Sequence, residues 1–157
     1  MHVRPAMDKD RQWITDLLRE RWGGPGIVVT GRMLNAAALP ALIAEDSGQR
    51  CGLATYELHN TECEIVSLDA VERFHGIGTA LVTAMADLAR ARHARRLVVT
   101  TTNDNLDALR FYQRRGFVIA TIRPDAIEES RRLKQAIPAT GCHGIPIRDE
   151  IELVRQV

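Results

Sequence analysis

The chain has 157 residues, 45% of them hydrophobic and 26% charged, which are the proportions of an ordinary globular protein. Its 21 Lys and Arg nearly balance its 20 Asp and Glu, so no overall field would draw in nucleic acid or an acidic membrane. Three widely spaced cysteines and the lack of a roughly 20-residue apolar run argue against a disulfide framework, a zinc site and a membrane span. We expect one domain over residues 1–157, in the cytoplasm and without a metal.

The N-terminal part is predicted to form a strand, a helix and a meander. After a short strand at residues 3–5, Asp8 can cap a helix that ends at the glycines of residues 23–26. A weaker helical segment is expected at residues 32–39. Three strands then follow, joined by turns, and we expect them to pair in an antiparallel meander; they cover residues 41–44, 51–58 and 63–68.

The C-terminal part switches between helical and strand periods. Two β-α-β crossovers are predicted, with helices near residues 77–88 and 106–112 and strands at residues 97–102 and 117–122. A charged helical segment at residues 125–135, a loop and an alternating strand at residues 145–154 complete the chain. The alternation of that last strand is typical of an edge or a half-exposed strand, which leaves homodimerisation open. The pattern predicts an α/β (α+β) fold, a mixed sheet flanked by helices.

A glycine-containing turn stands between the strand ending at Leu68 and the helix starting near Gly76. The first N–H groups of a helix have no partner within it, and glycines let an anion approach the backbone closely. No Asp or Glu occurs from Arg73 through Ala86, and Arg73 and His75 supply cationic or donor groups instead. These features predict a phosphate-binding turn. No Lys follows the glycines, which argues against a P-loop, and the preceding meander argues against a dinucleotide fold.

Two motifs on this background resemble those of the GNAT N-acetyltransferases. Arg73-x-x-Gly76-x-Gly78 is similar to the pyrophosphate loop of that family, and the segment from Asn105 to Phe117, with Phe111-Tyr112 and Gly116, resembles its second signature. The resemblance covers roughly residues 62–122. It implies a mixed, mostly antiparallel sheet of about seven strands flanked by about four helices.

The resemblance also implies how acetyl-CoA is held. The pantetheine arm is expected along the backbone of the strand ending near Ala70, and the diphosphate on the amides of the glycine turn. Asn105 either caps its helix or contacts the cofactor. The expected cofactor-binding residues are Val66, Leu68, Ala70, Arg73, Phe74, His75, Gly76, Ile77, Gly78, Thr79, Asn105 and Tyr112.

Four residues are candidates for the chemistry. The Leu68 N–H is expected to polarise the thioester carbonyl, and the Tyr112 phenol to protonate the departing thiolate, although an aromatic there more often serves packing than chemistry. Alternation along the strand places Glu62 and Glu64 on the face of Val66 and Leu68, where either could take the proton of an amine. We favour Glu64.

The sequence therefore predicts an N-acetyltransferase that moves an acetyl group from acetyl-CoA to a primary amine by direct attack. A silent acyl-CoA-binding module and a small nucleotide-binding protein are the alternatives. Cys142 and His143 are interpreted as a surface pair without a catalytic role. The acceptor itself is not readable from the sequence.

Overall fold

The structure is a computed structural model that describes residues 1–73 and 75–157. Its main sheet has seven strands in the order β1-β4-β5-β6-β7-β9-β8. Neighbouring strands are antiparallel except β6 and β7, which are parallel. The strands are β1 (His2–Pro5), β4 (Ala41–Asp46), β5 (Gln49–His59), β6 (Glu62–Ala70), β7 (Arg96–Thr102), β8 (Val118–Arg123) and β9 (Glu150–Gln156). The predicted fold class is confirmed.

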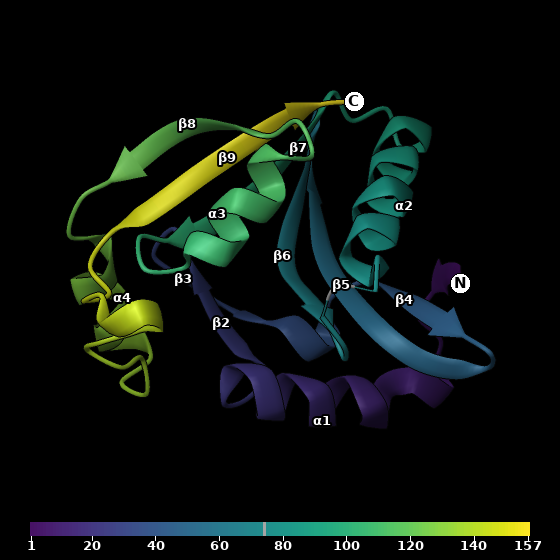
Figure 1. The fold of residues 1–157 in the computed structure, drawn as a ribbon, viewed down its shortest axis with the longest axis horizontal. Helices are drawn as coiled ribbons and strands as arrows, with labels where there is room; N and C mark the ends of the chain where they lie inside the picture. The colour runs from purple at the N-terminus through teal and green to yellow at the C-terminus, as the bar shows by residue number, and fades with distance from the viewer. Residues whose placement is uncertain (74) are drawn as a thin grey trace.

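Helices cover both faces of this sheet (Figure 1). Helices α2 (Ile77–Ala91) and α3 (Leu106–Gln113) pack on one face, in a core that includes Leu81, Met85 and Tyr112. Helix α1 (Arg11–Trp22) packs on the other face, in a second core with Leu53 and Val66. Helix α4 (Ala126–Leu133) contacts the small hairpin of β2 (Gly26–Val29) and β3 (Arg32–Asn35). None of the helices in the described part of the chain is long and apolar enough to cross a membrane.

The weak helix predicted for residues 32–39 is wrong. This segment forms β3, followed by the single 3-10 turn Ala36–Ala38 that the Asn35 side chain caps. Thr30 and Gly31 both have positive φ, at 49° and 75°, which is the backbone of a tight two-residue hairpin turn. That turn pairs residues 26–29 with residues 32–35 and overrides the helical preference of the alanines.

Helix α1 begins at Arg11 rather than next to Asp8. Asp8 opens a 3-10 turn, Asp8–Asp10, and its carboxylate accepts a hydrogen bond from the Arg11 side chain. The buried Asp10 side chain accepts hydrogen bonds from the Met7 N–H and from Arg4 and Arg50. This cluster shapes the turn, so the helix starts two residues later than a helix capped by Asp8 would.

The C-terminal strand is not an edge. Strand β9 pairs with both β7 and β8, so the second predicted crossover joins two strands that β9 separates. The charged residues of β9 suggested an exposed strand, but in the structure they have hydrogen-bond partners within the protein. Arg123 donates to Glu152, and the Thr30 N–H donates to the buried Glu150. The observation that left dimerisation open at this strand therefore does not hold.

Candidate functional site

Strands β6 and β7 are paired over only part of their length. Their pairing joins residues 62–65 to residues 96–99, and beyond Ile65 the two strands separate. A pocket of about 760 Å³ opens beside this unpaired part of β6, between the N-terminal end of α2 and α3. Its volume lies within the range of about 300–1,000 Å³ that is usual for cofactor and small-molecule sites.

Most of the predicted site residues line this pocket, although they come from three separate segments of the chain. The nine that line it are Leu68, Ala70, Arg73, Gly76, Ile77, Gly78, Thr79, Asn105 and Tyr112. Val66, His75, Glu62 and Glu64 are not among its described lining residues. Phe74 lies outside the described part of the chain.

The N-terminal end of α2 presents free backbone donors to the pocket. Gly76 is the N-cap residue with a φ of 77°, and the first turn of α2 contains no acidic residue. The N–H groups of Ile77, Gly78 and Thr79 belong to the first turn and have no acceptor within the helix. A side chain added at Gly76 would meet no heavy atom within 4 Å among the described residues. The helix end is thus open to an anionic group.

Gly78 allows helices α2 and α3 to touch. A Cβ at this position would lie 2.9 Å from the Cζ of Phe111, much closer than ordinary carbon contacts of about 3.5–4.0 Å. Arg115 stacks 3.7 Å from the centre of the Phe111 ring and donates to the Thr79 hydroxyl at 2.6 Å. These contacts fix the two helices that flank the pocket.

Five arginines and three carboxylates line the pocket, which gives it a positive balance for an anionic ligand. Arg73 is exposed and forms an ion pair with Asp107 at 3.3 Å, so a ligand phosphate can exchange with that carboxylate. His75 is exposed and lies 3.8 Å from Glu72. The arginines are Arg21, Arg73, Arg110, Arg114 and Arg115, and the carboxylates are Asp69, Glu72 and Asp107.

The open side of β6 offers backbone groups to the pocket. The Val71 N–H donates to the Cys51 carbonyl of β5, and residues 67–70 pair regularly with residues 52–55 of that strand. Because alternate residues of a strand direct their N–H groups to opposite sides, the N–H groups of Leu68 and Ala70 point away from β5. They face the region where β7 has separated, and an extended ligand could pair with them.

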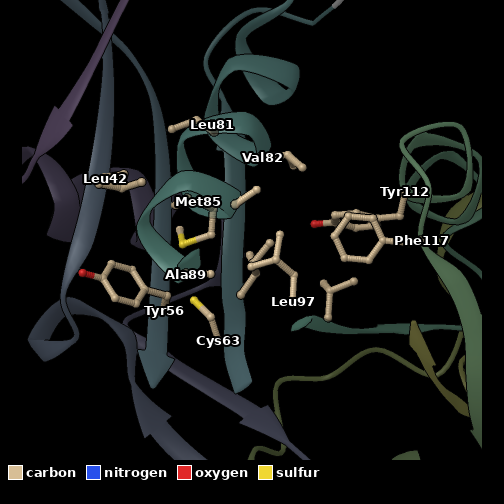
Figure 2. Packing of buried hydrophobic residues seen from close by; sticks show 14 of the residues in the cluster. Leu42, Tyr56, Cys63, Leu81, Val82, Met85, Ala89, Leu97, Tyr112 and Phe117 are labelled. Atoms are coloured by element: carbon tan, nitrogen blue, oxygen red, sulfur yellow. The ribbon is translucent and has the colours of Figure 1, made fainter. Parts of the chain in front are cut away.

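Tyr112 is buried and lines the pocket. Its ring makes edge contacts with Phe111 and Phe117, at 5.1 Å and 5.2 Å between ring centres. Figure 2 shows Tyr112 beside Phe117, with its hydroxyl directed toward the α2 side. Burial raises the pKa of the Tyr112 phenol well above its ordinary value, and the charge of Asp69 raises it further. The hydroxyl therefore keeps its proton across the neutral range.

Asn105 caps helix α3. Its side-chain oxygen accepts a hydrogen bond from the Ala108 N–H at 3.1 Å, and the residue also lines the pocket. The capping role considered from the sequence is confirmed, while contact with a ligand stays a prediction.

A β-bulge in β6 makes the predicted alternation wrong. Thr55 pairs with Ser67 and Tyr56 with Ile65, so Val66 is an extra residue. Val66 packs in the α1 core, whereas Leu68 packs in the core of α2. Because the extra residue shifts the period by one, Glu62, Glu64 and Val66 lie on the α1 face and Leu68 lies on the other.

The two glutamates of β6 have partners of their own. Arg96 donates to Glu62 at 2.8 Å. Glu64 lies 3.6 Å from His59 and 3.8 Å from Arg32, and burial raises its pKa. Three atoms that could bind a metal ion lie within 4.8 Å of one another, one each from Glu57, His59 and Glu64. The Arg32 guanidinium, 3.1 Å from Glu57, already supplies a positive charge at this place.

Sequence reasoning missed Asp69 and Arg115 and named Phe111 only as part of the second motif, although all three line the pocket. Asp69 directly follows Leu68, so a search of the strand for further carboxylates would have found it. The role of Gly78 against Phe111 and Arg115 depends on helix packing, for which the sequence carries no local signal.

The sequence profile of the Acetyltransferase (GNAT) family matches residues 10–117. The chain belongs to this GNAT acetyltransferase family. It is 38% identical over 152 residues to YdhI of Bacillus subtilis strain 168, a match that covers 96% of this chain and 95% of YdhI. It is 35% identical over 158 residues to YxbD of the same strain, covering 100% and 99% of the two chains. Both relatives bear the description uncharacterised protein.

Solved GNAT structures share the fold. A GNAT family acetyltransferase from Elizabethkingia anophelis with acetyl-CoA bound has a TM-score of 0.69 and 19% identity, over 99% of this chain and 97% of that one. A Bacillus subtilis acetyltransferase in complex with CoA has a TM-score of 0.72 and 18% identity, over 99% and 98%. The resemblance noted in the sequence is confirmed, and the pocket found here lies on a GNAT fold.

Proposed function

We propose that this GNAT acetyltransferase moves the acetyl group of acetyl-CoA to a primary amine by direct attack while both substrates are bound. The observation that carries the proposal is the pocket at the separation of β6 and β7, which combines an open strand edge, an open helix N-terminus and a buried phenol. The bound acetyl-CoA and CoA in two structures of the same fold support this choice of cosubstrate.

The cofactor can be assigned to these features part by part. The diphosphate suits the N–H groups of residues 77–79, since anions bind favourably at a helix N-terminus. Arg73 can then exchange Asp107 for a phosphate oxygen. The pantetheine amides suit the free N–H and C=O groups of Leu68 and Ala70, as an added strand would. His75, Phe74 and Val66, which were expected from the family pattern, remain predictions.

The acetyl group then lies between Leu68 and Tyr112. The Leu68 N–H donates to the thioester oxygen and stabilises the negative charge that develops there during attack. The amine nitrogen forms a bond to the carbonyl carbon, the bond from carbon to sulfur breaks, and the Tyr112 hydroxyl gives its proton to the departing thiolate. The attacking nitrogen becomes positively charged when it bonds to carbon, and it returns the phenolate's proton through water as it becomes the neutral amide. The raised pKa of Tyr112 keeps this acid protonated.

The amine must lose its ammonium proton before attack, and Glu64 is the candidate base that the sequence provides. Four residues of strand separate it from Leu68, which is about 13 Å, so it can act only through water. Glu62 is a poorer candidate because Arg96 binds its carboxylate.

The test is to measure CoA thiol release and acetylated amine together, using acetyl-CoA with spermidine, butylamine, amino acids, aminoglycosides and peptides. We expect equal amounts of thiol and acetylated product with at least one amine, and reduced turnover in Tyr112→Phe; the turnover of Glu64→Gln shows whether this candidate base is needed. Acetyl-CoA binding without an acetylated product from any of them would instead indicate a silent acyl-CoA-binding module.

We also propose that the protein acts in the cytoplasm. Its three cysteines, Cys51, Cys63 and Cys142, are free thiols in the structure, which suits a reducing compartment. Fractionation of cells, followed by detection of the protein, tests this directly.

A further inference from the structure

Asp69 lies on the side of the sheet from which an acceptor must approach. It pairs with Leu53, whose side chain packs with α1, whereas Leu68 packs in the core of α2 and α3. Because directly paired residues project to the same face, the Asp69 side chain faces α1. The proposed cofactor-binding segments, residues 76–79 and 105–112, belong to α2 and α3. An amine must therefore reach the thioester from the α1 side, where Asp69 is a neighbour of Leu68.

The Asp69 carboxylate is held in place from one side. The Trp22 Nε1–H donates to its Oδ2 at 2.9 Å, and Trp22 is the one side chain of the described residues that donates a hydrogen bond to this carboxylate. Lys134 fixes the end of α1 in turn, since its Nζ donates to the carbonyl of Trp22 at 2.7 Å and to that of Gly26 at 2.6 Å. Asp69 lines the pocket, and a carboxylate can accept several hydrogen bonds, so acceptor capacity remains for a ligand.

The charges around Asp69 suit a group that exchanges a proton. Burial raises the pKa of Asp69, and the Trp22 hydrogen bond and the charge of Arg21 offset part of this rise. Tyr112 and Arg115 of α3 face the same pocket. A carboxylate with a raised pKa is a better match for accepting a proton near neutral pH than an exposed one.

We propose that Asp69 is the residue that binds the ammonium group of the acceptor and takes its proton directly, with Trp22 as its positioning residue. This inference rests on the proposed function. One proton passes from the ammonium to the Asp69 carboxylate, which leaves a neutral amine to attack the thioester. After the product leaves, Asp69 returns that proton to solvent, so the reaction releases one proton in all. Glu64, about 13 Å along the strand from Leu68, is then dispensable for this step.

The matched comparison is Asp69→Asn against Glu64→Gln and Asp16→Asn. Asparagine keeps an oxygen for the Trp22 hydrogen bond but cannot take a proton, and Asp16 is an exposed residue of α1 that pairs with Arg19. With the amine that turns over fastest in the panel, we expect kcat/KM for the amine to fall at least about 100-fold in Asp69→Asn. The acidic limb of its pH profile should disappear, while the Kd for acetyl-CoA changes less than about twofold. Asp16→Asn should match the wild type.

Stability provides a second measurement that separates catalysis from structure. A carboxyl group whose pKa is raised by folding opposes folding once the pH rises above its unfolded value of about 3.9. Asp69→Asn should therefore melt at a higher temperature than the wild type at pH 7, and this difference should vanish below about pH 4. A lower melting temperature at pH 7 would show that Asp69 only anchors Trp22, and would overturn the inference.

The fluorescence of Trp22 reports on the carboxylate without any turnover. In a Trp13→Phe background, Trp22 is the one remaining tryptophan, and its emission should titrate with a midpoint above the ordinary pKa of Asp. Asp69→Asn should remove this transition. Full activity of Asp69→Asn, with activity lost in Glu64→Gln, would refute the inference and leave the proposed function standing. Failure of every amine to react would instead refute the proposed function.

Discussion

Two glycines with the same φ make it possible to separate the role of the α2 N-terminus in binding from its role in folding. Gly76 opens α2 at the pocket, and Gly48 lies in the turn between β4 and β5; both have a φ of 77°. At neither position would an added Cβ meet a described heavy atom within 4 Å. Replacing each with Ala therefore introduces the same strain and no steric clash.

The magnitude follows from the backbone conformation. A residue with a Cβ in the left-handed region costs about 1–2 kcal/mol, which corresponds to a loss of about 2–8 °C in melting temperature for a domain of this size. We expect this loss in both Gly76→Ala and Gly48→Ala. Only at Gly76 would the methyl group also stand where a diphosphate approaches the helix.

The affinity for CoA should differ between the two variants. Loss of one hydrogen bond to a charged group costs about 1.5–3 kcal/mol, so Gly76→Ala should bind CoA about 10- to 100-fold more weakly. Isothermal titration of Gly48→Ala should give the wild-type affinity. If both variants bound CoA like the wild type, the diphosphate could not lie against the first turn of α2.

Three further substitutions test other parts of the structure. Tyr112→Phe should lower kcat while the Kd for acetyl-CoA stays unchanged. Because the pKa of Tyr112 is raised, the pH–rate profile of the wild type should show no loss of activity from deprotonation of this group up to about pH 10. Gly78→Ala should lower the free energy of unfolding by about 1–2 kcal/mol in urea titrations, because its Cβ would press on Phe111; a stability equal to the wild type would contradict the packing of α2 on α3. Asp10→Asn should cost about 3 kcal/mol at pH 7, since it leaves Arg4 and Arg50 without their buried partner. Arg4 holds the pKa of Asp10 below its unfolded value, so this difference should shrink as the pH falls below about 4, and a difference independent of pH would contradict the assignment.

The fold was predictable wherever local periodicity and turns agreed. Ile77, Leu81 and Met85 recur at helical spacing and indeed face one core, and the meander strands appear close to their predicted bounds. Residues 32–39 were not predictable in this way, because a two-residue turn with positive φ at Thr30 decides their structure. The interior position of β9 depends on Arg123, 27 or more residues away along the chain, which binds its glutamates.

The site was predictable where the backbone itself supplies the chemistry. The open end of α2 and the free edge at Leu68 follow from glycines and from the end of a strand, and both lie in the pocket. The orientation of Glu64 was not predictable, because the extra residue Val66 reverses the alternation of the strand and no sequence signal marks this bulge. Asp69 is visible in the sequence as a carboxylate next to Leu68, but its hydrogen bond from Trp22, 47 residues earlier, appears only in the folded structure.

A crystal structure of the protein with acetyl-CoA is the most direct measurement. We predict the diphosphate on the N–H groups of residues 77–79, the thioester oxygen within hydrogen-bonding distance of the Leu68 N–H, and the sulfur beside the Tyr112 hydroxyl. Acetyl-CoA bound elsewhere, or with its sulfur remote from Tyr112, would contradict the account.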